Sequence, residues 1–283
     1  LGNVLWSTTD LNYVINGGFG VYRNEGKVIA AYLSAKEGQN WINNGGPVKS
    51  KVINNPFIEN KLSSPVIEFL WDAISYCSKY IINDSQFYKM GKVPVVLNSL
   101  TLIEKGKIYV DEISVISPNT ILDASLGEII IDKNVRIGPF CYLVGPLFVA
   151  KNSIVEPHTF LNGGTIIGPH SRIGGEITRT IIHGFTNKVH YGYFGDSYVG
   201  EWANIGAGST CSNMKNNYNN IKVHVNDTIV NTKSRKIGSF IGDYVKTAIG
   251  TTLNTGTIIG PGCNIVSEGF PPKNLPPFTW YYN

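Results

Sequence analysis

An aliphatic residue recurs at every sixth position through the middle of the chain, and this spacing limits the possible folds more than any other feature. The uninterrupted run has eight members: Ile131, Ile137, Leu143, Val149, Val155, Leu161, Ile167 and Ile173. A period of six fits neither the turn of an α-helix nor the alternation of a simple strand. It fits a coil of three short strands, roughly 18 residues per turn, in which each aliphatic side chain stacks on its equivalent in the next coil.

We therefore predict a mainly β fold, a left-handed parallel β-helix with a small N-terminal α/β region and an extended C-terminal tail. The pattern returns after a break, with Thr247 as a weak member, at Val199, Ile205, Ile241, Leu253, Ile259 and Ile265. An ordinary β-sandwich is the alternative, but turns at regular spacing would not produce eight aliphatic residues at strict sixes.

The chain divides into three predicted parts. Residues 1–108 show no sixes, and we expect a small α/β region with a strand over 26–33 and an amphipathic helix that starts near Pro65. Residues 109–270 form the β-helix, which we expect to be interrupted over 179–194 and by a polar excursion over 211–236 with a hairpin at Asn226-Asp227. Residues 271–283 hold four prolines and four aromatic residues, and we expect a tail that covers the last sheet edge.

Composition narrows the possible partners and the compartment. The net charge is +4 and the Lys and Arg residues are scattered, so we expect no nucleic-acid partner. No apolar run is long enough for a membrane span and no signal segment is evident, so we expect a cytoplasmic protein without membrane contact. The chain begins at Leu1 rather than Met, which is typical of a fragment or a processed form. Cys77, Cys141, Cys211 and Cys263 form no C-x-x-C pair, and we expect free, buried thiols.

One string carries a more specific signal than the repeats. His190-x-x-Tyr193-x-Gly-Asp196 is followed by Asn204-x-Gly206-Ala-Gly. This string resembles the acetyltransferase half of the bifunctional glucosamine-1-phosphate acetyltransferase/uridyltransferases, and related sugar-nucleotidyltransferase-like proteins of the hexapeptide-repeat type. The resemblance covers roughly residues 110–270.

The resemblance implies a CoA-dependent N-acetyltransferase that uses acetyl-CoA, needs no metal and works as a homotrimer. His190 would be the general base, a role that suits imidazole because it titrates near neutral pH. Asn204 would lie in the sugar site and share the catalytic centre, and Tyr193 would contact the sugar phosphate. The remaining matches are Asn213 as a polar substrate contact, Lys222 as a contribution to a neighbouring subunit's site, and Gly206 and Ala207 along the pantetheine arm.

The sequence departs from that family where phosphate is held. An arginine and a lysine of the family correspond to Asn162 and Thr178 here, although Arg179 stands next to the second position. Lys233, Arg235 and Lys236 offer positive charge for a phosphate or for the 3′-phosphate of CoA. A solvated charge run is the alternative for these three residues.

Other readings of the sequence stay open or are disfavoured. The histidines at 158, 170, 183 and 190 do not have the spacing of a shared zinc site. Residues 1–108 lack a nucleotide-binding motif, so we expect a truncated or degenerate nucleotidyltransferase-like region and no nucleotidyl transfer.

The leading hypothesis is transfer of an acetyl group from acetyl-CoA to the amine of an amino-sugar phosphate or nucleotide sugar. The alternative is a non-catalytic β-helix that serves as an assembly or regulatory module of a sugar nucleotidyltransferase. The sequence does not specify the sugar or the acyl group.

Overall fold

The computed structural model describes residues 3–24, 27–45, 57–59, 62–94 and 99–283. The chain divides into two compact units, Leu1–Phe69 and Leu70–Asn283. None of the helices in these ranges is long and apolar enough to cross a membrane. The four cysteines are buried, free thiols, as predicted.

The first unit is a small α/β structure. Its sheet has the order β2-β1-β3, in which β1 (Gly20–Asn24) runs antiparallel to β2 (Lys27–Tyr32) and parallel to β3 (Phe57–Glu59). Helix α1 (Thr8–Asn16) is capped by Ser7, and α2 (Ala35–Asn43) begins with a capping box formed by Ser34 and Glu37. The strand predicted over 26–33 is therefore present as β2.

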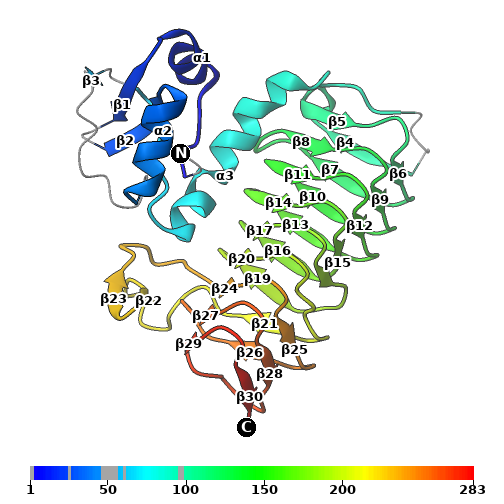
Figure 1. The fold of residues 1–283 in the computed structure, drawn as a ribbon. Helices are drawn as coiled ribbons and strands as arrows, with labels where there is room; N and C mark the ends of the chain where they lie inside the picture. Colours follow the sequence, from blue (N-terminus) through cyan, green and yellow to red (C-terminus); the bar gives the residue numbers. More distant parts are fainter. Residues whose placement is uncertain (1–2, 25–26, 46–56, 60–61, 95–98) are drawn as a thin grey trace. The chain divides into compact units, whose positions relative to one another are not determined.

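The second unit is the predicted β-helix, a solenoid of about ten turns over residues 101–282. Figure 1 shows its parallel strands stacked along one axis. Six strands form one face: β4 (Thr101–Ile103), β7 (Ile121–Asp123), β10 (Tyr142–Val144), β13 (Phe160–Asn162), β16 (Glu176–Thr178) and β19 (Tyr193–Gly195). Nine form the second: β5 (Ile108–Val110), β8 (Ile129–Ile131), β11 (Leu147–Val149), β14 (Thr165–Ile167), β17 (Ile181–Ile182), β20 (Tyr198–Val199), β24 (Phe240–Ile241), β27 (Ile258–Ile259) and β29 (Asn274–Leu275).

The third face is built from shorter strands. Its upper part holds β6 (Val115–Ile116), β9 (Arg136–Ile137), β12 (Ile154–Val155), β15 (Arg172–Ile173) and β18 (Asn187–Lys188). Single-residue bridges at Asn204 continue it to β25 (Lys246–Thr247), β28 (Asn264–Val266) and β30 (Trp280–Tyr282). A separate pair, β21 (Thr210–Cys211) and β26 (Thr252–Leu253), completes the lower coils.

The residues at strict sixes form the core. All eight members from Ile131 to Ile173 are almost completely buried, and each lies beside its equivalent in the neighbouring coil. Small residues four positions further on, such as Ser153 and Thr165, are buried as well and bond to main-chain carbonyls at the corners. The six-residue period therefore predicted correctly which of these side chains face the core.

The prediction that residues 179–194 leave the coils was wrong. Strands β17, β18 and β19 lie in this segment and pair in register with the coil above. The coil is shorter here, because Ile173 pairs with Lys188, only fifteen residues later. A shortened coil and a lysine at an inward position remove the six-residue pattern without ending the solenoid.

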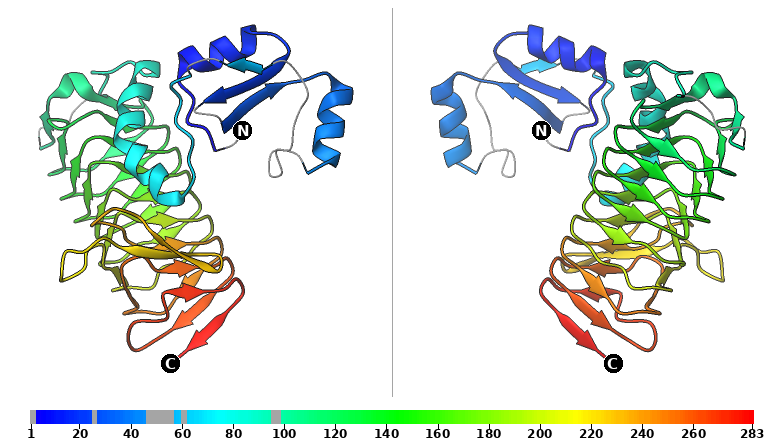
Figure 2. Two further views of the ribbon diagram at one scale, coloured as in Figure 1. Left: turned by 90° about the vertical axis from the view of Figure 1, so that its left-hand side faces the viewer. Right: turned by 90° about the vertical axis from the view of Figure 1, so that its right-hand side faces the viewer.

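The second interruption is present as predicted. Strand β22 (Lys222–Val225) runs antiparallel to β23 (Thr228–Asn231), with the turn at Asn226 and Asp227. Both Figure 1 and Figure 2 show this hairpin standing away from the coils. The C-terminal residues add β29 and β30 to the last edges of two faces, as expected of a segment that covers those edges.

One helix accompanies the solenoid. Helix α3 (Leu70–Asp84) matches the predicted amphipathic helix and ends in a 3₁₀ turn at Ser85–Phe87, and a second 3₁₀ turn spans Lys105–Lys107. Helix α3 packs across β11, β14 and β20 of the nine-stranded face (Figure 2). Its buried face includes Ile74, which joins a cluster with Ile221, Val223, Ile237 and Phe240.

Candidate active site

The histidine of the motif lies at a corner of the β-helix. His190 follows β18, precedes β19, and is exposed to solvent. The corner at Gly206–Gly208 belongs to the next coil, where the Gly208 amide donates to the Tyr191 carbonyl at 3.1 Å. The structure thus brings the predicted base and the predicted cofactor strip to adjacent coils.

Backbone groups of that strip take part in the stacking of the coils. A Cβ on Gly206 would clash with the main chain of Ala248, and the Gly206 amide donates to Thr247 Oγ1 at 3.0 Å. The Ala207 carbonyl accepts from the Gly250 amide at 2.7 Å. The glycine is therefore required for the close approach of the next coil, whatever else the strip binds.

Two asparagines lie one above the other before this corner. The Asn187 Nδ2 group donates to Asn204 Oδ1 at 3.0 Å, and Asn204 is otherwise exposed. In the described part of the chain, Asn187 Oδ1 is the only buried side-chain nitrogen or oxygen without a hydrogen-bond partner. Buried acceptors are normally satisfied, so this unpaired atom is an exception in the fold.

A second group of predicted residues meets at the other end of β19. The Asn213 amide donates to Tyr193 Oη at 2.8 Å and to Asp196 Oδ2 at 2.5 Å. The Arg179 guanidinium binds Asp196 Oδ1 through Nε and Nη2, both at 2.6 Å. Burial, followed by the nearby Asp196 carboxylate, raises the pKa of Tyr193 to about 12, so its hydroxyl stays protonated. Asp196 thus joins Arg179 to Asn213, and Asn213 joins both to Tyr193.

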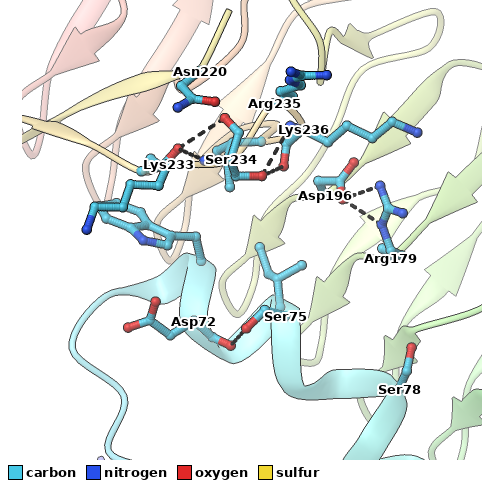
Figure 3. Close-up of a pocket in the computed structure, with 14 residues that line it drawn as sticks. Asp72, Ser75, Ser78, Arg179, Asp196, Asn220, Lys233, Ser234, Arg235 and Lys236 are labelled. Atoms are coloured by element: carbon cyan, nitrogen blue, oxygen red, sulfur yellow. Dashed lines mark hydrogen bonds and ion pairs between the residues drawn. The ribbon is translucent and has the colours of Figure 1, made fainter.

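Arg179 borders a cavity of about 900 Å³. Its walls are the first turns of α3, the Arg179–Asp196 pair and the segment 232–237 that leads back into the solenoid (Figure 3). Lys233, Arg235 and Lys236 line it, and none of the three is in an ion pair with another described residue. Among the described residues that line the cavity, four are basic and only Asp72 and Asp196 are acidic, so this lining carries excess positive charge.

The predicted residues therefore fall into groups. His190, Asn204, Gly206 and Ala207 lie near one corner, whereas Tyr193, Asn213, Arg179 and the three basic residues lie near the next. Lys222 belongs to neither, because it lies on β22 outside the cavity lining.

Sequence reasoning did not assign three features of this region. Asp196 was visible in the Gly-Asp pair of the motif, but its partners are 17 residues away in each direction. The α3 wall of the cavity had no sequence signal. Lys188 lies where the aliphatic pattern stops, so the pattern did not predict that it faces inward.

Comparisons with known proteins found distant relatives of this chain. The chain is 32% identical over 136 residues to a bifunctional sugar-1-phosphate nucleotidylyltransferase/acetyltransferase of Sulfurisphaera tokodaii, covering 47% of this chain and 34% of that protein. It is 29% identical over 212 residues to the bifunctional protein GlmU of Thermotoga petrophila, covering 66% and 44%. GlmU of Methanocaldococcus jannaschii is 30% identical over 138 residues, covering 49% and 31%.

No protein-family model matches the chain. The matched regions span between about a third and under half of these three relatives. The chain is therefore distantly similar to bifunctional nucleotidyltransferase/acetyltransferase proteins, and its β-solenoid is consistent with a hexapeptide-repeat domain.

Proposed function

We propose that this chain is an acyltransferase that moves an acetyl group from acetyl-CoA to the amine of an amino-sugar phosphate or nucleotide sugar. One observation carries the proposal: in a chain similar to acetyltransferase-containing proteins, an exposed histidine stands directly above the Gly206–Gly208 corner. The proposal extends to a cytoplasmic homotrimer, in which Lys222 would serve a neighbouring subunit's site.

The chemistry needs a base and a held acceptor. The acceptor nitrogen attacks the thioester carbonyl, His190 takes the proton from that nitrogen, and the carbon–sulfur bond breaks to release CoA. Asn204 and Tyr193 orient the acceptor. Gly206 and Ala207 line the path of the pantetheine arm.

Positive charge supports an anionic acceptor. Arg179 is held by Asp196 and borders the cavity together with Lys233, Arg235 and Lys236. Guanidinium and ammonium groups at a partly enclosed site favour a phosphate or diphosphate. Tyr193 and Asn213 connect this phosphate end of the site to β19 and hence to the His190 corner.

Calorimetric titration with acetyl-CoA tests the proposal. We expect saturable binding to the wild-type chain and unchanged binding to His190→Ala, because the base does not hold the cofactor. If the folded chain releases no heat on titration, the proposed acyltransferase function is refuted. That result would favour the assembly module, in which Gly206 serves only the stacking of coils.

A further inference from the structure

A lysine occupies a core position of the β-helix just before the His190 corner. Lys188 is 2% exposed, and the stack above it is aliphatic: Ile173, Val155 and Ile137 hold the same place in successive coils. In these coils an aliphatic side chain is therefore sufficient to fill this core position. An ammonium group there requires another explanation, because a buried charge opposes folding.

The ammonium group connects two corners. Lys188 Nζ donates to the Gly174 carbonyl at 2.8 Å and to the His190 carbonyl at 3.0 Å, and it lies 5.4 Å from the centre of the Phe194 ring. A Cβ on Gly175, which has φ +85°, would approach Nζ to 3.0 Å. The absence of a side chain at Gly175 therefore leaves space for the ammonium group.

The charge of Lys188 has no counter-ion within the described residues. Burial lowers the pKa of Lys188 to about 8, so the group is still mainly charged at neutral pH. Its two carbonyl bonds are thus charge-assisted and stronger than bonds between neutral groups.

One of these two bonds is made to the main chain of His190. Among the described residues, no side chain forms a hydrogen bond with the imidazole of His190, so the backbone sets the position from which the ring extends. Among the described residues, Lys188 is the one whose side chain forms a hydrogen bond with that backbone.

We propose that Lys188 is a positioning residue: its ammonium group holds the His190 carbonyl and thereby sets the corner from which the imidazole reaches the acceptor amine. This inference rests on the proposed role of His190. It assigns to Lys188 no contact with the acceptor or with acetyl-CoA.

Lys188→Met tests this because it keeps the length and apolar stem and removes the donors. Ile173→Met, one coil above in the same stack, is the matched control for altered packing. We expect Lys188→Met to fold, with the amides of Tyr193 and Gly208, which donate to Thr210 Oγ1 and to the Tyr191 carbonyl, exchanging at least about tenfold faster while those of β12 and β15 are unchanged. With acetyl-CoA and glucosamine 1-phosphate, kcat should fall about 10- to 100-fold with KM within about twofold, since small misplacement of a catalytic group lowers rate strongly. Ile173→Met should change neither quantity.

The outcomes separate the two claims. If the wild-type chain is inactive but Lys188→Met exchanges faster, the acetyltransferase proposal is refuted, whereas the claim that Lys188 restrains the His190 backbone is supported. An active Lys188→Met with unchanged exchange would overturn the positioning role. Lys188→Ile, which repeats the residue of the coil above, is the second variant. Failure of both variants to fold would show a structural role and contradict the inference.

Discussion

At the scale of single residues, Lys188 and Asp196 place charge where the β-helix otherwise packs apolar or small side chains. Asp196 is buried, but Arg179 and Asn213 satisfy both of its oxygens. Lys188 has only carbonyl partners and a ring face. Since replacing buried charge by apolar bulk is often stabilising, the lysine should lower the stability of the fold.

The stability of Lys188→Met should therefore depend on pH relative to wild type. The pKa of Lys188 falls from 10.5 to about 8 on folding, so the penalty is full below pH 8 and disappears as the pH rises through 10.5. A pKa shift of that size lowers the free energy of unfolding by about 3 kcal/mol when the lysine is charged. Urea unfolding at pH 7 and pH 10 should show the advantage of the variant shrinking at the higher pH. A pH-independent difference would contradict a buried, charged lysine.

The sequence predicted residues best where they obey the repeat. The aliphatic residues at sixes were assigned to the core because identical environments recur in each coil. Lys188 could not be placed in the same stack, because its chemistry argues against burial unless the carbonyls of Gly174 and His190 are known to be near. The Tyr193–Asn213 contact likewise needs the fold, which brings residues 20 positions apart together.

At the scale of elements, shortened coils limited the prediction. The segment 179–194 keeps its strand pairing while its coil loses three residues, so a fixed period fails there. The hairpin of β22 and β23 was predictable because its turn and alternation are local signals. The cavity was not, because its walls come from α3, from β16 and β19 corners, and from the 232–237 segment.

Helix α3 should be anchored through one face. Ile74 is buried against Ile237 and Phe240, whereas Ile82 is largely exposed. Ile74→Ala should lower the free energy of unfolding by about 2–4 kcal/mol, the usual effect of emptying a buried aliphatic site. Ile82→Ala should change it by less than about 1 kcal/mol. Chemical denaturation of both variants checks this, and equal effects would show that α3 does not pack as described.

The segment 232–237 should act through charge. Replacing Arg235 and Lys236 together by Gln should raise KM for glucosamine 1-phosphate about tenfold at low salt, with kcat nearly unchanged. Added salt should reduce the difference because exposed charges are screened. Lys151→Gln, on an exposed corner outside the cavity lining, is the control. A KM that stays at the wild-type value would remove these residues from the phosphate site.

At the scale of the whole molecule, the repeat determines a regular solenoid, and the proposed site lies at its shortened coil. The shortened coil, the buried lysine, the exposed histidine and the hairpin all fall between residues 173 and 236, and the cavity draws most of its lining from the same region. The relatives that the chain matches are two to three times as long as the matched region. Residues 1–69 form a unit of their own with a small sheet.

Acetyl transfer itself is the most direct test of this account. The purified chain would be mixed with acetyl-CoA and glucosamine 1-phosphate, and the acetylated sugar detected by mass spectrometry, for wild type, His190→Ala and the control His183→Ala. We predict product from wild type and from His183→Ala, with a rate about 10²- to 10⁴-fold lower for His190→Ala, as expected when a general base is removed. Equal rates for His190→Ala and wild type would contradict the assignment of His190, and no acetylated product from any amino-sugar phosphate or nucleotide sugar would contradict the acetyltransferase.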